Sequence, residues 1–486
     1  MADYRYNLQE PGDFSLSDVT IFSYRPGEGD NPYGIEIKSL ITEINIFESI
    51  GSKTLSGNIV MADGFNLPED LPLTGLERIE FKFNTPSVIS NTTFDFTSES
   101  GSPMYVYKID SRKRINQSAQ VYILHFCSKE AFFNEKNRVN VALDGAYEDM
   151  INELVRNKEY LNSKKRLFVE ESKSINRYVV PNQRPFATID MICEETQSKK
   201  YNSSGYLFFE NKQGFHFRSY ESLIAYNGIR TRTPQEYFVV EAGSVRGGGG
   251  DLPIQDTMRR IRKFNIDKQY DTILNMRGGA FASNLITVDT FNKKIQSYDY
   301  NYFDDFTNYF HLQGTQSGDK TDNFHLLPDT PSDEFGKNLS DYPSKRFMYS
   351  TTDKIFNDYK GIEHKDIVRQ RNAQRILRNH IVVSVEIAGN TTIDAGDVIH
   401  LEIPQVKEAP RGEDLFLSGN YLIRHIRHNV SILANKHTTT MECIKDSVRT
   451  NYPSVRSVND NTFIGREKEK KEAINLSKQE SIENLT

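Results

Sequence analysis

The chain has 486 residues and a formal net charge of −6, from 60 lysine and arginine residues against 66 aspartate and glutamate residues. This near-balance argues against a protein whose main role is to bind nucleic acid, and the length predicts roughly two to four domains with enough chain for a sizeable core. The three cysteines, Cys127, Cys193 and Cys443, lie far apart without a Cys-x-x-Cys pair, so neither a disulfide framework nor a zinc site is expected.

The composition also indicates where the chain folds. No stretch approaches the roughly 20 apolar residues of a membrane span, and the first residues lack the apolar centre of a signal peptide. We therefore expect a soluble protein with no membrane anchor that folds in a reducing cytoplasm. The 30 phenylalanines and 25 tyrosines suit a β-rich core or large protein–protein contacts.

Alternation of apolar and polar residues between positions 41 and 83 predicts three short strands joined by two loops. Ile44 and Ile46 share one face, opposite Glu43 and Asn45, which is the period of a half-buried strand. The alternation recurs further along, where the inner face consists of Ile79, Phe81 and Phe83. Nothing in this stretch predicts a catalytic site.

Two further strands, at 105–109 and 120–126, are expected to close a first β-barrel, with the polar segment 110–118 as the loop between them. After Lys129 the apolar period changes from two to about 3.6, which predicts helices. The first of these helices carries its apolar stripe in residues 147–155.

A second helix and a hairpin are expected after residue 180. Pro185 stands at the favoured first position of the helix. Cys193 lies on the inward face of this helix, so we interpret it as a core residue rather than a nucleophile. The hairpin strands lie at 206–210 and 215–217, around a glycine turn. The glycine run 247–250 predicts a flexible joint, because a phosphate loop would need a following Lys-Ser or Lys-Thr pair.

The second half of the chain returns to strand periodicity. The expected strands lie at 273–276, 285–290, 381–387, 399–403 and 438–446. In the last of them Met441 and Cys443 point inward. The aromatic-rich region from about 300 to 365 has no regular period, which is typical of a functional or interface-forming insertion.

Several short motifs occur in one order along the chain. They are Leu55-Ser-Gly-Asn-Ile59, Leu71-Pro-Leu-Thr-Gly-Leu-Glu77, Arg184-Pro-Phe186, Gly396-Asp-Val-Ile-His-Leu-Glu-Ile-Pro404 and Thr438-Thr-Thr-Met-Glu-Cys-Ile-Lys-Asp446. Together they resemble the baseplate central hub proteins of contractile-tailed, T-even-like bacteriophages. The N-terminal part of type VI secretion spike proteins is similar as well.

The resemblance implies an α+β fold that is mostly β, with two β-barrel domains, an inserted α+β domain and a charged C-terminal tail. The expected boundaries are 1–130 for the first barrel, 131–265 and 300–372 for the inserted domain, 266–299 and 373–450 for the second barrel, and 451–486 for the tail.

The resemblance also implies a structural function without catalysis, as the hub of a phage tail baseplate. In that family three copies form a ring, and their six barrels would adapt a three-fold central spike to a six-fold tail tube. The implied partners are two further copies of the chain in a homotrimer, the central spike protein, and tail tube and baseplate proteins. DNA would only pass in transit through the ring. No cofactor is implied, and the implied location is the virion.

Three alternatives to a hub stay open. A spike component of another contractile injection system would need an oligonucleotide-fold domain and β-helix repeats, which this sequence lacks. A tail-associated glycan hydrolase would need two carboxylates facing each other across a cleft, and a glycan-binding tail protein would bind sugar as an isolated trimer. Asp304, Asp305, Glu194 and Glu195 are the carboxylates that could be proposed, although a solvated face explains them better.

No residue is predicted to be catalytic, to bind a cofactor or to hold a metal. His425 and His428 are three residues apart on an expected strand and so lie on opposite faces, which makes them poor ligands of one ion. The candidates for contact with partners are four arginines of an expected helix and three apolar residues of the tail, namely Arg369, Arg371, Arg375, Arg378, Ile474, Ile482 and Leu485. A solvated helix face and a disordered tail are the alternatives.

Overall fold

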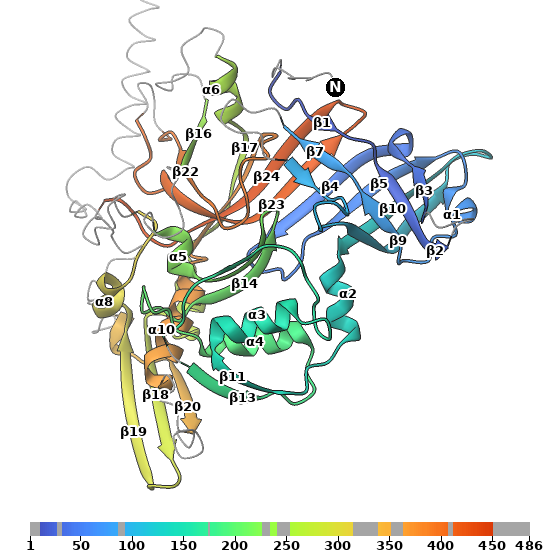
Figure 1. Ribbon diagram of the computed structural model, residues 1–486. Coiled ribbons are helices and arrows are strands. Elements are labelled where there is room, and N and C mark those ends of the chain that lie inside the picture. The colour runs from blue at the N-terminus through green and yellow to red at the C-terminus, as the bar shows by residue number, and fades with distance from the viewer. Residues whose placement is uncertain are drawn as a thin grey trace, which may run out of the picture. The chain divides into compact units, whose positions relative to one another are not determined.

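A single sheet of thirteen strands runs through both halves of the chain (Figure 1). The computed structural model describes residues 10–26, 32–85, 93–173, 175–225, 234–240, 253–313, 339–350, 363–406 and 412–450. All of them belong to one unit, which ends at Thr450. The sheet and the helices between its strands confirm the predicted fold class, α+β and mostly β. None of the described helices is both long and apolar enough to cross a membrane.

The N-terminal part of the chain, which was expected to be a closed first barrel, forms an arm of the large sheet that no pairing among the described strands closes into a ring, and we keep the name first barrel for it. Its strands are β1 (Ser15–Leu16), β2 (Thr20–Pro26), β3 (Pro32–Glu36), β4 (Ile41–Ser49), β5 (Ser56–Asp63), β6 (Arg78–Glu80), β7 (Lys82–Asn84), β8 (Thr93–Asp95), β9 (Met104–Arg114) and β10 (Gln120–Ser128), with the short helices η1 (Lys38–Leu40) and α1 (Leu67–Asp70) between them. Seven strands follow one another in the large sheet as β4-β5-β10-β9-β6-β2-β3, and β1, β7 and β8 form a small sheet of their own.

The packing of the first barrel confirms the predicted alternation. The inward side chains are at most 1% exposed, namely those of Ile44, Ile46, Ile79, Phe81 and Phe83. The hairpin between β9 and β10 differs from the prediction, because β9 continues to Arg114 in register with Gln120. The loop is therefore shorter than the polar segment 110–118, since exposed polar residues can extend a strand as well as form a loop.

The second barrel is a closed ring. Its strands are β16 (Gln235–Val239), β17 (Arg260–Gln269), β21 (Ile381–Ala388), β22 (Val398–Glu402), β23 (Gly419–Ser431) and β24 (Lys436–Lys445). They follow one another as β22-β16-β17-β21-β24-β23, and pairing of β22 with β23 completes the ring. The helix α6 (Ile254–Arg259) immediately precedes β17.

The strands of this ring differ from those expected for the second barrel. β16 was expected in the inserted domain, but it pairs in parallel with β17 and β22, and its Tyr237 lies in the barrel core. In contrast, β18 (Ala282–Asp289) and β19 (Lys294–Asn301) leave the ring and form a separate sheet with β20 (Lys345–Ser350). Periodicity alone identifies a strand but does not identify its partners, so neither difference was visible in the sequence.

The elements between residues 129 and 224, which we call the inserted domain, lie outside the large sheet. They are α2 (Lys129–Lys136), β11 (Ala142–Ala146), α3 (Tyr147–Arg156), β12 (Leu167–Val169), β13 (Ile175–Val179), α4 (Pro185–Glu195), β14 (Tyr206–Asn211), β15 (Gly214–Ser219) and α5 (Tyr220–Ile224). The helices α3 and α4 and the hairpin β14–β15 confirm the predicted elements and share one core. The predicted glycine joint at 247–250 lies outside the described residues.

One predicted strand is wrong. Residues 273–276 belong to the helix α7 (Thr272–Arg277), because the Asp271 side chain caps its first turn by accepting a hydrogen bond from the Leu274 N–H at 3.0 Å. Further along, the short helix α8 (Tyr302–Asp305) follows β19, and α10 (His364–Leu377) packs against β18. The strand β20 was not predicted within the irregular region 300–365.

Candidate functional site

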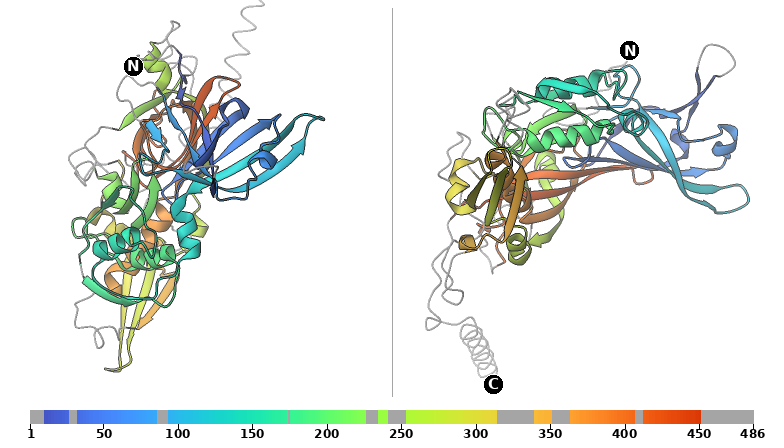
Figure 2. Two further views of the ribbon diagram at one scale, coloured as in Figure 1. Left: turned by 45° about the vertical axis from the view of Figure 1, so that its right-hand side comes forward. Right: turned by 90° about the horizontal axis from the view of Figure 1, so that it is seen from below.

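The seam between the two barrels is the pairing of β4 with β23. The register runs from Ser49 opposite His425 to Glu43 opposite Ser431. Figure 2 shows the blue strands of the first barrel running beside the orange strands of the second. On the inner side, Ile44 of β4 lies in the same hydrophobic core as Val430 of β23. The two barrels are therefore parts of one hydrogen-bonded sheet.

The outer side of this sheet carries polar residues, and we name it the seam face; it comprises the outward side chains of β17, β21, β24, β23, β4 and β5. One row of cross-strand partners crosses the seam and continues to β9, and it consists of Thr438, Asn429, Asn45, Asn58, His125 and Lys108. Asn429 Nδ2 donates to Asn45 Oδ1 at 2.9 Å, and Asn45 Nδ2 donates to Asn58 Oδ1 at 2.9 Å. Amide groups thus connect the barrels on this side.

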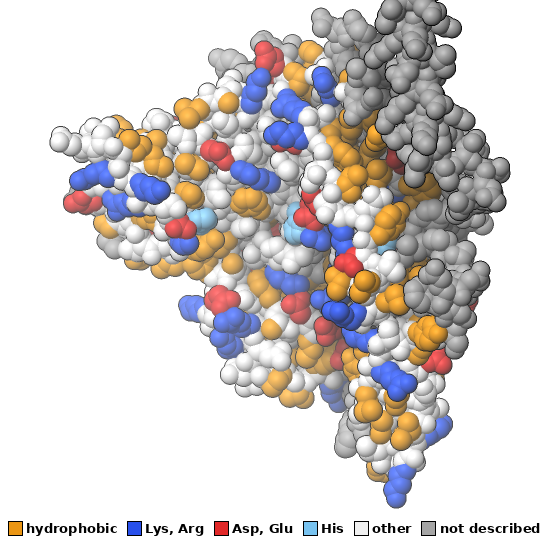
Figure 3. Space-filling view, turned by 180° about the vertical axis from the view of Figure 1, so that it is seen from behind, with side chains coloured by type: hydrophobic (Ala, Val, Ile, Leu, Met, Phe, Trp, Pro, Cys, Tyr) orange, Lys and Arg blue, Asp and Glu red, His pale blue; other side chains and the backbone are white. Residues whose placement is uncertain are grey.

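Three cations on the seam face each lie beside a carboxylate of a neighbouring strand. The pairs, with their N–O distances, are Arg427–Glu43 at 3.2 Å, Arg424–Glu442 at 2.6 Å and Lys263–Glu386 at 2.8 Å. Burial lowers the pKa of His425, opposite Glu442, so this imidazole adds no charge at neutral pH. On the side of the molecule that Figure 3 presents, basic and acidic side chains are interspersed with one another and with hydrophobic side chains.

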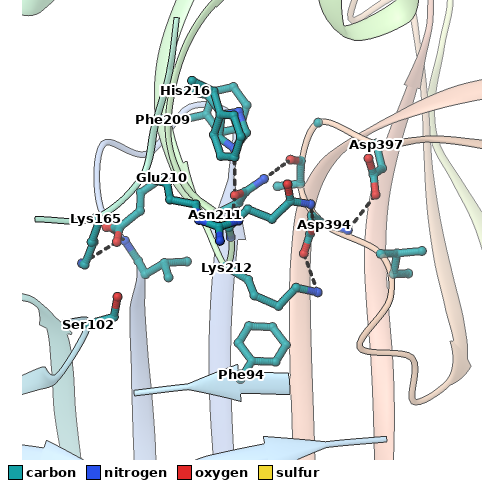
Figure 4. A pocket seen from close by; sticks show the side chains of 18 of the residues that line it. Phe94, Ser102, Lys165, Phe209, Glu210, Asn211, Lys212, His216, Asp394 and Asp397 are labelled. Carbon is teal, nitrogen blue, oxygen red and sulfur yellow. Dashed lines mark hydrogen bonds and ion pairs between the residues drawn. The ribbon is translucent and has the colours of Figure 1, made fainter. Parts of the chain in front are cut away.

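A second cluster lies where both barrels meet the inserted domain. Glu48 at the end of β4, Lys212 in the turn between β14 and β15, and Asp394 in the loop before β22 come together there, and Figure 4 shows Lys212 reaching Asp394. Lys212 Nζ lies 2.7 Å from Asp394 Oδ1. The Glu48 carboxylate accepts hydrogen bonds from the backbone N–H groups of Lys212 at 3.1 Å and Ala395 at 3.0 Å. This junction triad connects three separate parts of the chain.

The junction triad holds two carboxylates but only one ammonium group. Burial raises the pKa of Glu48 to about 8, and the nearby charge of Asp394 adds to the rise. Burial also raises the pKa of Asp394, while Lys212 opposes that rise. At neutral pH we therefore expect Glu48 to be protonated and Asp394 to carry the charge that Lys212 neutralises.

A second triad ties the inserted domain to the first barrel. Lys165 Nζ lies 2.9 Å from Glu130 Oε2 and 2.5 Å from Glu210 Oε1, and all three side chains are buried. Glu210 also accepts a hydrogen bond from the Leu55 N–H at 2.8 Å. Burial acts to raise the pKa of Glu130, but Lys165 and hydrogen bonds outweigh it and leave the pKa lowered, while burial raises the pKa of Glu210.

A cavity of about 810 Å³ opens between these triads, bordered by β8, the β14–β15 hairpin and the loop before β22. Its four carboxylates all have partners within the chain. Glu210 and Asp394 belong to the triads, Asp95 lies 2.9 Å from Lys82 Nζ, and Asp397 accepts a hydrogen bond from the Asp394 N–H at 3.1 Å. The carboxylates that line the cavity therefore stabilise the contacts between the inserted domain and the two barrels.

The carboxylates considered for a glycan hydrolase lie elsewhere. Asp304 and Asp305 belong to α8, and Asp305 accepts a hydrogen bond from Asn308 at 2.8 Å. Glu194 and Glu195 end α4, where Glu195 accepts a hydrogen bond from the Tyr178 hydroxyl. The described contacts of Asp305 and Glu195 hold local structure.

His428 and His437 behave as core residues. His428 and His437 are buried side by side, with 3.2 Å between Nδ1 and Nε2, and His437 Nδ1 lies 2.6 Å from Thr85 Oγ1. Burial lowers the pKa of both imidazoles, that of His437 to about 3. His425 lies on the opposite side of β23, as predicted. Among the described residues, no three His, Cys, Asp or Glu side chains could hold a metal ion together.

The cysteines are buried as well. Burial raises the pKa of Cys127 and of Cys193 to about 12, so both stay protonated at neutral pH. The interpretation of Cys193 as a core residue is confirmed by its position in the core of the inserted domain.

The four candidate arginines lie on or just after α10, and the structure separates them into two kinds. Three of them are partly buried. Arg369 donates to the backbone oxygens of Asp299 and Lys365, and Arg378 lies 6.0 Å from the ring centre of Tyr220. Burial lowers the pKa of Arg371. Arg375 is the exposed member. The candidate tail residues Ile474, Ile482 and Leu485 lie outside the described residues.

Sequence reasoning missed both triads, although a signal was present. Glu48 is in phase with Ile44 and Ile46, so an acidic residue occupies the inward face of a predicted strand. Such a residue needs a buried partner, but Lys212 is 164 positions away in the sequence and Asp394 is further still. The partners could not be chosen without the fold.

No protein-family model matches the chain. Over 425 residues it is 20% identical to the probable baseplate hub protein gp334 of Vibrio phage KVP40. The aligned region covers 85% of this chain and 92% of that protein. A tail protein from Neisseria meningitidis MC58 aligns with a TM-score of 0.48 and 10% identity, over 89% of this chain and 97% of that one. The E. coli c3393 protein, a component of the type VI secretion system, aligns with a TM-score of 0.40 and 8% identity, over 85% and 76% of the two chains.

Both TM-scores lie below 0.5, so the relationship rests on the sequence match. That match extends over most of both chains. The resemblance inferred from the ordered motifs is confirmed: this chain is similar along most of its length to a phage baseplate hub protein.

Proposed function

We propose that the chain is a structural hub of a phage tail baseplate and that three copies form a ring. The match to a baseplate hub protein supports the hub role. The observation that carries the proposal is the seam between β4 and β23, because it fuses two barrels into one sheet within a single chain. Three such chains present six barrels, which suits an adaptor between a three-fold spike and a six-fold tube.

In this role the chain makes and breaks no covalent bond. The two buried triads hold the inserted domain against both barrels, so that the ring keeps its shape when the tail contracts. DNA passes through the ring during ejection. The working location is the tail of the virion, after synthesis in the host cytoplasm.

The proposed partners are the central spike protein, the tail tube and other baseplate proteins. Arg375 is exposed and available to an acidic partner surface, whereas Arg369, Arg371 and Arg378 pack against the chain itself. The tail residues Ile474, Ile482 and Leu485 are proposed to bind an apolar groove on a neighbouring subunit.

Two measurements test this function. Mixed with the spike protein of the same phage, the chain should form a complex with equal numbers of both proteins, and a mass that stays that of the separate proteins at micromolar concentration would contradict a hub. Purified peptidoglycan should release no muropeptides with the chain. Release that one Asp or Glu substitution abolishes would replace the hub with a glycan hydrolase.

A further inference from the structure

We propose that Lys212 and Asp394 form an amide bond between their side chains once the chain has folded. The junction triad holds the groups that this reaction needs, namely an amine, a carboxyl group for it to attack and a third acid that moves protons. The bond would join the turn of the inserted domain covalently to the loop before β22 of the second barrel. It forms once per chain and involves no substrate, so it goes beyond the proposed hub function without depending on it.

The reacting pair is buried and in contact. Lys212 Nζ lies 2.7 Å from Asp394 Oδ1, and the two side chains are 8% and 2% exposed. The ring of Phe94, itself fully buried, has its centre 5.1 Å from Nζ. Well-oriented groups within one molecule react as if present at about 10⁵–10⁸ M. Folding therefore favours a condensation that a free amine and a free carboxylate do not complete in water.

The two oxygens of the Asp394 carboxylate have different surroundings. Oδ2 accepts a hydrogen bond from Gln213 Nε2 at 2.6 Å. Such a donor stabilises the negative charge that develops on this oxygen when an amine attacks the carboxyl carbon. Oδ1 contacts the Lys212 amine and, in the described part of the chain, accepts no hydrogen bond. Oδ1 is therefore the oxygen that is free to leave.

Glu48 lies against the main chain on both sides of the reacting pair. Its carboxyl group accepts hydrogen bonds from the N–H of Lys212 itself and from the N–H of Ala395, the residue after Asp394. Burial, helped by the nearby charge of Asp394, raises the pKa of Glu48 to about 8, so this group is a carboxylic acid at neutral pH. An acid in this position supplies the proton that a departing oxygen requires.

The reaction is a condensation that releases one water molecule. A proton first passes from the Lys212 ammonium group to Oδ1 of Asp394, which leaves a neutral amine and a carboxylic acid. The amine lone pair then forms a bond to Asp394 Cγ. Glu48 donates its proton to the Oδ1 hydroxyl, the Cγ–Oδ1 bond breaks as water leaves, and Glu48 takes a proton back from the nitrogen. The products are an amide, the regenerated Glu48 acid and water, which leaves through the adjoining cavity.

The other lysine–carboxylate pairs of the described residues each lack one of these features. Burial alone would lower the pKa of Lys165, but Glu130 and Glu210 outweigh it and raise the pKa, so this amine stays a charged ammonium group that does not attack. The other lysines that pair with an aspartate are 26% to 53% exposed, so water keeps them charged as well. The junction triad is thus the place in the described structure where a buried lysine–aspartate pair meets a protonated acid.

The test measures the mass of the purified full-length chain under denaturing conditions, before and after digestion with trypsin. The mass should be lower than that of the sequence by one water molecule. Trypsin does not cleave after an acylated lysine, so the peptide 201–218, which holds Lys212, should appear joined to the peptide 379–407, which holds Asp394. A chain that keeps the full mass after prolonged incubation in the folded state would overturn the proposal.

Three variants test the role of each group. Lys212→Arg keeps the positive charge but has no amine to acylate, so it should show its full mass and no joined peptide. Glu48→Gln keeps both reacting groups and removes the acid. General acid–base catalysis contributes about 10²–10⁴-fold to a rate, so most of the freshly purified Glu48→Gln chain should still have its full mass. The control Lys199→Met removes an amine from an exposed pair and should lose one water as the unchanged chain does.

Melting temperatures show which variants are folded. A folded Glu48→Gln chain that is joined as completely as the unchanged chain would contradict the role of Glu48. The mass of the unchanged chain decides the proposal even where a variant does not fold. Because this mass is that of a single denatured chain, its result is independent of the number of copies in the hub, and a missing bond would leave the proposed function standing.

Discussion

Lys212 Nζ lies 2.7 Å from Asp394 Oδ1, so the turn of a hairpin in the inserted domain is bound to the second barrel by a buried ion pair. The substitution Lys212→Met removes the ammonium group and leaves a buried carboxylate without its partner. We expect the free energy of unfolding to fall by about 3–5 kcal/mol, measured by urea denaturation at pH 7.

The matched control is Lys199→Met. Lys199 lies 2.8 Å from Glu171 with both side chains more than half exposed, at 66% and 74%. Its loss should cost at most about 1 kcal/mol. If Lys212→Met were no more destabilising than this control, the junction triad would not hold the domains together.

The protonation of Glu48 predicts how stability depends on pH. The folded protein keeps this proton up to about pH 8, whereas the unfolded chain releases it near the ordinary value of 4.5. Glu48 therefore makes stability decrease as pH rises from about 4.5 to 8, by at most about 1.4 kcal/mol per pH unit. In Glu48→Gln this contribution is absent, so the stability of the variant should fall less over that range.

Other groups titrate in both the unchanged chain and Glu48→Gln, so the effect of Glu48 is the difference between their two profiles of stability against pH. Burial raises the pKa of Glu221 to about 7, for example. Urea denaturation at pH 5, 6.5 and 8 gives the two profiles. Parallel profiles would show that Glu48 is already ionised in the folded protein at neutral pH.

Gly57 of the Leu-Ser-Gly motif is predicted to tolerate no side chain. A Cβ atom at this position would collide with the ring of Phe126 and with the backbone oxygen of Asn45 on the neighbouring strand. We expect Gly57→Ala to lower the free energy of unfolding by about 1–3 kcal/mol. The control is Gly51→Ala, whose Cβ would lie 3.5 Å from Ser49 Oγ and should change stability by less than about 0.5 kcal/mol.

The tail is predicted to act in assembly and not in folding. Residues 464–486 lie beyond Thr450, where the described unit ends. Deleting them should leave the melting temperature of the chain unchanged and weaken its binding to the spike protein, measured by titration calorimetry. The full-length variant with Ile474, Ile482 and Leu485 all changed to serine should bind as weakly as the deletion, and undiminished binding by both would remove the docking role.

Local periodicity predicted about half of the strands and three of the longer helices, because it depends on neighbouring residues. The alternation of Ile44 and Ile46 and the helix that begins at Pro185 are confirmed. The short helix α7 was predicted as a strand, because six residues are too few to separate the two periods.

Contacts between distant segments could not be predicted in the same way. β16 joins the second barrel through pairing with β22, which lies more than 150 residues later. The junction triad likewise depends on three segments that only the fold brings together. Glu48 on an inward face predicts that a partner exists, and the identity of Lys212 and Asp394 follows only from the structure.

The proposed hub depends on a ring of three copies of this chain. Light scattering on the purified chain at micromolar concentration measures the number of copies. A ring of three should give a mass three times that of the 55.9 kDa chain, unchanged on tenfold dilution. A mass of one chain at every concentration, with and without the spike protein, would contradict it.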